Sequence, residues 1–339
     1  MTENSLDPIS RTFWYCVPFD EWPDAVDILT IIFEVSGIIL NLLTAFLLFR
    51  IRHGPRQNVV LLKTLTIHCL LVCIVNLIED CDPDGVTTDN YVFNTLMCVF
   101  WNARFFYWIF FVAVSQCLVF LAVDRVLTLY KCDQLRFTSP RRRIVVYEIT
   151  IHAFSTLLTL PQVLTVNLQH GGCACAPNKV NIPFLTVIYA HVYLWFTLLF
   201  VTDGSILLCS AYYIMKWVRE TPSRDQLDDL NELSFEVFSE HGIHLEQYKG
   251  KGYKTASMCI LPLAMSYILT FSYDSTYQFV SALGLATFII NSIPQKIGGL
   301  LLVVHVNVVP VVLFFYLPPL KEFAARYFLA PLHVVKYPK

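Results

Sequence analysis

Long stretches of apolar residues follow one another along almost the whole chain, separated by shorter polar segments. Each stretch approaches or exceeds the ~20 residues that a helix needs to cross the hydrocarbon core of a bilayer. The pattern therefore predicts seven transmembrane helices in an all-α membrane protein. They cover residues 25–49, 58–78, 93–130, 144–166, 182–217, 255–288 and 297–316.

The last third of the chain allows a second interpretation, because polar residues at positions 274–277 interrupt the apolar pattern. Residues 255–273, 278–292 and 297–316 would then form three short helices, and the chain would have eight. The middle stretch is too short to cross a bilayer comfortably by itself. We therefore prefer seven helices.

Composition supports a membrane protein. Of 339 residues, 56% are hydrophobic and only 15% are charged, which leaves too little polar surface for a soluble domain of this length. The net charge of −2 and the lack of a basic stripe with interleaved aromatic residues argue against nucleic acid as a partner. We expect the lipid bilayer to be the main surroundings of the chain.

Basic residues gather on one side of the predicted helices, in the first, third and fifth connections and after residue 316. Acidic residues dominate the other side. Because cytoplasmic loops carry an excess of Lys and Arg, residues 1–24 are predicted to be an extracellular N-terminus. Residues 25–316 form the transmembrane domain, with a third cytoplasmic loop at about 218–254. An eighth span would place the basic tail, residues 317–339, outside the cell, which is a second argument for seven.

The tail contains one amphipathic segment. Its apolar residues recur at i, i+3, i+4, i+7 and i+8, which predicts a short helix lying on the inner membrane face. They are Leu320, Phe323, Ala324, Tyr327 and Phe328.

Several polar residues, one proline and three cysteines stand at positions that together form a recognisable set of motifs. Gly37 and Asn41 lie in the first predicted helix, and Asp124 is followed by Arg125 at the inner end of the third. The seventh helix contains an Asn-Val-Val-Pro sequence and a later tyrosine, and cysteines stand at the outer end of the third helix and in the following outer loop. These residues are Asn307, Pro310, Tyr316, Cys98, Cys173 and Cys175.

Together, these motifs resemble the rhodopsin-like (class A) family of G-protein-coupled receptors. The resemblance implies a plasma-membrane receptor that transmits an extracellular ligand signal to a heterotrimeric G protein. It implies that Asp124 and Arg125 form the switch, together with Asn307, Pro310 and Tyr316. It also implies a disulfide from Cys98 to either Cys173 or Cys175.

The chain departs from the family at several positions. Val126 stands in place of the Tyr of the Asp-Arg-Tyr motif, and Cys69 stands where the family has a sodium-binding carboxylate. The sixth predicted helix has no Cys-Trp-x-Pro sequence. The resemblance therefore points to a divergent branch of the family.

The ligand-binding residues are predicted from their distance in sequence before Arg125, by comparison with the family. Tyr107 falls where amine receptors of the family have Asp, which argues against a small-amine receptor. Aromatic residues below acidic outer loops suit a basic or aromatic peptide. Arg104 is a charge in an outer half-span, and it either binds a ligand carboxylate or pairs with Glu34 or Asp274. The predicted ligand-binding residues are Trp101, Arg104, Tyr107, Trp108, Phe111, Asp274 and Tyr277.

Other functional classes fit the sequence less well. A chemosensory seven-helix protein or channel that uses no G protein would be favoured by inverted topology, which the charge distribution argues against. A transporter would be expected to show internal repeats. An enzyme is not expected, because His68, His152, His191 and His305 fall in different helices with no metal-binding spacing. We expect no cofactor and no metal.

Overall fold

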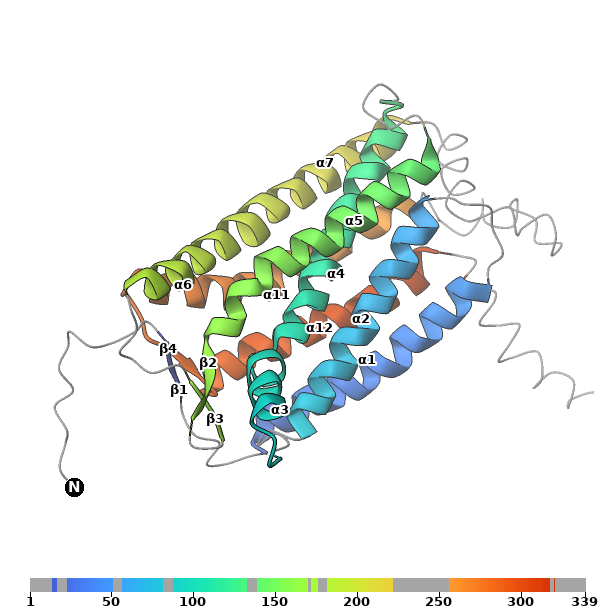
Figure 1. Cartoon of the computed structure of the whole chain (residues 1–339). Coiled ribbons are helices and arrows are strands. Elements are labelled where there is room, and N and C mark those ends of the chain that lie inside the picture. The colour runs from blue at the N-terminus through green and yellow to red at the C-terminus, as the bar shows by residue number, and fades with distance from the viewer. Residues whose placement is uncertain are drawn as a thin grey trace, which may run out of the picture.

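The computed structural model describes residues 14–16, 23–50, 57–81, 88–132, 139–169, 172–175, 182–221, 256–317 and 320. Within them the chain folds into long helices that pack side by side as a bundle (Figure 1). The predicted tail helix and the third cytoplasmic loop lie almost wholly outside the described residues.

Seven helical columns make up the bundle in the described part of the chain. Columns three and five are each composed of two α-helices joined by a π-helical segment, Met97–Asn102 and Phe196–Asp203 respectively. Column four ends in a 3-10 segment, Leu160–Leu164, and column six begins with one, Ala256–Cys259. The α-helices are α1 (Ala25–Arg50), α2 (Gln57–Cys81), α3 (Tyr91–Leu96), α4 (Phe105–Leu129), α5 (Pro140–Thr159), α6 (Ile182–Trp195), α7 (Gly204–Glu220), α11 (Ile260–Ala282) and α12 (Ile293–Tyr316).

Six columns are long and apolar enough to cross a membrane, which confirms an all-α membrane protein. They are columns one to five and column seven. Many of their large apolar side chains point away from the bundle, such as Ile39, Leu157 and Phe315, each at least 61% exposed. In lipid this outward apolar surface is favourable, whereas in water it would not be. Column six is long enough as well, but its second half is polar.

The eight-helix interpretation is wrong, because residues 278–292 do not form a helix of their own. α11 continues without a break through the polar positions 274–277 and ends at Ala282. A turn then leads into strand β4, Phe288–Ile290, so the predicted sixth helix is also too long at its end.

Two small sheets lie at one end of the bundle, which Figure 1 shows beside α3. β4 pairs in parallel with β1, Trp14–Cys16. β2, Val166–Gln169, forms an antiparallel hairpin with β3, Gly172–Cys175. A disulfide joins Cys98 to Cys173, which decides between the two candidate cysteines. We call this end of the bundle the sheet end and the other the loop end.

Candidate functional site

The first and last helices meet along a polar seam. Pro310 lies inside α12 and has no N–H to donate, so the carbonyl of Val306, four residues earlier, loses its helical partner. Asn41 Nδ2 on α1 donates to this carbonyl at 3.3 Å and also to the carbonyl of Gly37 at 2.9 Å. A carbonyl group without a hydrogen bond is costly in lipid. By donating to the Val306 carbonyl, Asn41 offsets the cost of having Pro310 inside α12.

The close approach of these helices depends on Gly37. A Cβ added there would lie 2.6 Å from Cys73 Sγ and 3.0 Å from Asn307 Nδ2. Asn307 Nδ2 donates to the carbonyl of Phe33 at 2.9 Å, and its Oδ1 accepts from Ser36 Oγ at 2.9 Å. Of the predicted switch residues on α12, Asn307 and Pro310 therefore belong to the contact with α1. Tyr316 is half-buried against the core near the loop end. We call Gly37, Asn41, Val306, Asn307 and Pro310 the α1–α12 seam.

A second group of polar residues lies at the loop end. Arg125 is 1% exposed, and its Nε donates to Ser257 Oγ at 3.0 Å. Asp124 is fully buried, and its Oδ1 lies 3.8 Å from Arg143 Nε on α5. The Asp-Arg sequence on α4 thereby contacts column four through Asp124 and the start of column six through Arg125. We call Asp124, Arg125, Arg143 and Ser257 the inner latch. The sequence indicated the first two, but neither Arg143 nor Ser257.

The predicted aromatic residues on α4 are packed into the centre of the bundle. Tyr107 and Phe111 are almost fully buried, with stacked rings whose centroids lie 6.3 Å apart. Phe111 also stacks on Phe271 of α11, at 5.8 Å. Trp108 meets Trp195 of α6 edge-on at 5.2 Å. These side chains link columns three, five and six at the level where a ligand was predicted.

A buried carboxyl group missed by the sequence analysis lies near these aromatic residues. Asp203 ends the π-helical segment of column five, and its Oδ2 accepts from Gln116 Nε2 at 2.6 Å and from Ser115 Oγ at 3.1 Å. Ser115 Oγ also lies 3.0 Å from Tyr267 Oη of α11. Columns three, five and six are therefore joined by hydrogen bonds as well as by rings. In the sequence, the only feature that could have indicated this site was the position of Asp203, an acidic residue within the apolar run 182–217.

Arg104 connects the third column with α2 at the sheet end. Its Nη2 lies 2.6 Å from Asp80 Oδ1, and its Nε lies 3.4 Å from Glu79 Oε2. Arg104 thus has ion-pair partners within the protein, but they are Asp80 and Glu79, whereas the sequence analysis named Glu34 or Asp274 as the alternatives to a ligand carboxylate. Arg104 has a left-handed backbone, with φ of 54°, at the junction of the π-helical segment and α4. Such a conformation is strained in a residue other than glycine.

Glu34 of α1 is fully buried next to this pair. Asn76 Nδ2 donates to Glu34 Oε1 and, at 3.3 Å, to Asp80 Oδ2. A single amide nitrogen therefore lies between two carboxyl groups. We call Glu34, Asn76, Glu79, Asp80 and Arg104 the outer acidic cluster.

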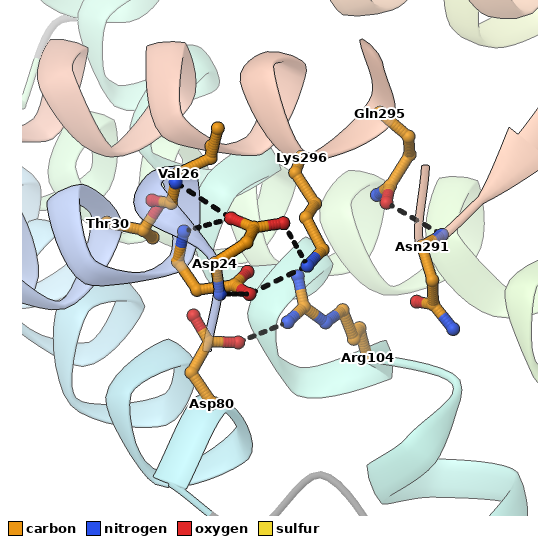
Figure 2. Close-up of polar contacts among 9 residues, drawn as sticks. Asp24, Val26, Thr30, Asp80, Arg104, Asn291, Gln295 and Lys296 are labelled. Carbon is orange, nitrogen blue, oxygen red and sulfur yellow. Dashed lines mark hydrogen bonds and ion pairs between the residues drawn. The ribbon is translucent and has the colours of Figure 1, made fainter. Parts of the chain in front are cut away.

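Lys296 joins α12 to the start of α1 at the same end of the bundle. Its Nζ lies 2.8 Å from Asp24 Oδ2 and 2.7 Å from Asp27 Oδ2. Asp24 caps α1, since its Oδ1 accepts from the backbone N–H groups of Val26 and Asp27, and Asp27 Oδ2 accepts from the N–H of Asp24. Figure 2 shows Lys296 directed at Asp24 and Arg104 directed at Asp80.

The hydrogen bonds to Asp24 change its acidity. Partial burial by itself would raise the pKa of this carboxyl group. The hydrogen bonds from Lys296, Asp27 and Val26 outweigh that effect and hold the pKa below its ordinary value of 3.8.

The remaining predicted ligand residues have internal partners. Asp274 is buried, accepts from Gln278 Nε2 at 2.8 Å, and lies against Gly298 of α12. Tyr277 Oη donates to the carbonyl of Thr287 at 3.0 Å. Trp101 is half-buried in the π-helical segment, with its ring 6.4 Å from that of Phe106. The structure thus brings Tyr107, Trp108 and Phe111 together, but places Tyr277 beside β4.

Comparisons with known proteins do not assign this arrangement to a family. No protein-family model matches the chain, and no curated protein sequence matches it. Within the described residues, no group of three or more His, Cys, Asp or Glu side chains is arranged to hold a metal ion.

Proposed function

We propose that the chain is a G-protein-coupled receptor of the plasma membrane. All seven columns cross the bilayer, and an extracellular ligand, such as a peptide, acts at the sheet end. A heterotrimeric G protein binds at the loop end. The observation that carries the proposal is the inner latch, where Arg125 is buried on α4 and hydrogen-bonded to Ser257 at the start of column six.

The latch has the properties of a two-state switch. A buried guanidinium at the membrane edge needs hydrogen-bond partners, and one partner of Arg125 is Ser257, on a different column from α4. Displacement of column six would break the Arg125–Ser257 bond and open the loop end around Arg125. A G protein that binds the open state would shift the population toward it.

The orientation of the chain rests on two independent features. The Cys98–Cys173 disulfide lies at the sheet end, and disulfides persist in oxidising surroundings such as the cell exterior. Described basic residues at the helix ends lie at the loop end, as expected for the cytoplasmic side: Arg50, Lys131, Arg141, Arg142, Arg143 and Arg219. Both features support an extracellular N-terminus.

The proposal is tested by expressing the full chain in cells with reporters for each G-protein class and measuring ligand-independent activation. The same cells are then screened with a library of peptides and small molecules. We expect a signal that Arg125→Ala abolishes at equal surface expression. Arg142→Ala is the matched control, because Arg142 is an exposed arginine on the first turn of α5 and its loss should leave the signal unchanged.

The alternative is a channel or transporter that uses no G protein. An ionic current or solute flux that survives Arg125→Ala, with no activation of any G protein, would replace the receptor proposal with this one.

A further inference from the structure

The outer acidic cluster has more hydrogen-bond acceptors than donors. Glu34 Oε2, Asn76 Oδ1 and both carboxylate oxygens of Glu79 are buried and have no hydrogen-bond partner, although Glu79 Oε2 lies 3.4 Å from Arg104 Nε. The three residues are 0%, 3% and 7% exposed. Buried acceptors without partners are costly, and every atom of this kind in the described cluster is an oxygen. The cluster therefore lacks donors.

The cluster also has an excess of acidic groups. Three carboxyl groups, on Glu34, Glu79 and Asp80, surround the single guanidinium of Arg104. Arg104 makes its direct ion pairs with Asp80 and Glu79, while the hydrogen bond of Glu34 comes from the neutral amide of Asn76. Buried carboxylates are normally paired with a cation. Carboxyl groups therefore outnumber cations in the cluster, and when all three are ionised a second cation would reduce its net negative charge.

One bound group with a positive charge and several N–H donors would correct both deficits. Water supplies donors but no charge. A metal ion supplies charge, but the acidic side chains described here are not arranged to hold one. A primary ammonium group carries one positive charge, three N–H donors and no acceptor. Its three donors match the three residues that carry oxygens without a hydrogen bond, Glu34 on α1 and Asn76 and Glu79 on α2.

We infer that the outer acidic cluster binds the primary ammonium group of an extracellular ligand through Glu34, Asn76 and Glu79. The role of that ligand as a signal rests on the proposed receptor function, but the binding itself does not. The ammonium group belongs either to a small amine or to the N-terminus or a lysine of a peptide. The ammonium-binding oxygens lie on α1 and α2, and the Tyr107 ring lies beside them, next to Arg104.

Asp80 and Arg104 form the entrance to this site. Their side chains are 17% and 36% exposed, whereas Glu34 and Glu79 lie behind them. An arriving cation competes with Arg104 for Glu79 and Asp80. Because Arg104 has a strained backbone directly before α4, weakening its ion pairs allows the start of α4 to relax. Arg125 of the inner latch lies on the same helix.

The inference is tested by measuring binding to the purified full chain in detergent, by isothermal titration calorimetry at up to millimolar ligand. The probe is phenethylammonium, whose ring suits the aromatic side of the site, since the Tyr107 ring lies 5.9 Å from the Arg104 guanidinium. Phenethyltrimethylammonium keeps the charge and removes the N–H donors, and 2-phenylethanol removes the charge. We expect binding of the primary amine and at least about tenfold weaker binding of the other two.

A second pair of probes identifies the source of the ammonium group. The dipeptide amide Phe-Ala-NH₂ is compared with its N-acetylated form. Tighter binding of the free peptide than of phenethylammonium assigns the site to a peptide N-terminus, and the reverse assigns it to a small amine. Either order supports the inference, provided that acetylation abolishes peptide binding.

Variants locate the site. Glu34→Gln and Glu79→Gln keep the side-chain shape, and each should weaken phenethylammonium binding by about tenfold or more. Glu148→Gln is the matched control, because Glu148 lies on α5 and accepts a hydrogen bond from Thr64, outside the cluster. Its binding should equal that of the wild type. Thermal unfolding of each variant establishes that it is folded.

Three results would overturn the inference: no binding of any primary amine to the folded protein, equal binding of the quaternary analogue, or binding that survives Glu34→Gln. None of them bears on the receptor proposal, because no G protein takes part in the measurement. Conversely, a protein that activates no G protein can still bind the amine.

Discussion

Individual polar residues in this bundle satisfy atoms that would otherwise be unpaired in lipid. Asn41 is the clearest case, since it supplies the donor that Pro310 removes from the Val306 carbonyl. The sequence indicated that an Asn inside an apolar helix needs a partner. It could not indicate which partner, because the carbonyl becomes available only when α1 packs against the proline turn of α12.

Asn41→Ala should lower the free energy of unfolding by about 1–3 kcal/mol, because it leaves the buried carbonyl without a donor. The measurement is denaturant or thermal unfolding of the purified protein in detergent. Ser36→Ala is the comparison, and its effect should be smaller, since Asn307 keeps its own two donor bonds in that variant. Equal stability of Asn41→Ala and wild type would show that the bond does not contribute.

The capping of α1 by Asp24 predicts a dependence on pH. The pKa of Asp24 is lower in the folded than in the unfolded state, so its carboxylate stabilises the fold above about pH 4. This contribution is lost as the pH falls through the folded value. Below about pH 4, the wild type should therefore lose stability more steeply than Asp24→Asn. Unfolding midpoints measured across this range test the prediction, with exposed Asp89→Asn as the control. Parallel curves for wild type and Asp24→Asn would contradict it.

At the scale of helices and strands, the apolar pattern located columns one to five and seven to within a few residues. It missed the first turn of α12, where Pro294 opens the helix and Gln295 and Lys296 are polar. It also missed both π-helical segments. One contains Cys98, which forms the disulfide with Cys173, and the other ends at Asp203, which accepts a hydrogen bond from Ser115 of α4. These are tertiary contacts, which a one-dimensional pattern does not contain.

Two glycines should respond in opposite ways to the same substitution. Gly37→Ala places a methyl group 2.6 Å from Cys73 Sγ, and it should force α1 away from its neighbours and destabilise the fold by about 1–3 kcal/mol. Gly299→Ala meets no atom within 4 Å in the described residues, and it should be neutral or stabilise α12 by up to about 1 kcal/mol. Unfolding midpoints of the two variants test this. A Gly37→Ala protein as stable as Gly299→Ala would show that close approach is not required.

At the scale of the whole molecule, the outer acidic cluster and the inner latch lie at opposite ends of the third column. Between them, hydrogen bonds and stacked rings join that column to columns five and six. The sequence indicated Arg104 and its possible partner Glu34 at one end, and Asp124 and Arg125 at the other. The partners Asp80, Glu79 and Ser257 lie on other columns, and only the packed bundle brings them together.

Ser257→Ala should raise ligand-independent G-protein activation severalfold, because it removes the hydrogen bond that joins Arg125 to column six in the closed state. The reporter assay in cells measures this at matched surface expression. Ser272→Ala is the control, since Ser272 bonds only within α11, to the carbonyl of Leu269. Unchanged basal activity in Ser257→Ala, with activity still lost in Arg125→Ala, would separate the role of Arg125 from this contact.

The α1–α12 seam also has a consequence for how the protein is made. Within the described residues, α1 is the first long helix to leave the ribosome and α12 is the last, and Figure 1 shows them side by side. Until α12 is inserted, α1 holds Asn41 in the membrane without the Val306 carbonyl and Ser36 without Asn307. A chain that stops before α12 therefore leaves polar side chains of its first helix in the bilayer without their partners on α12.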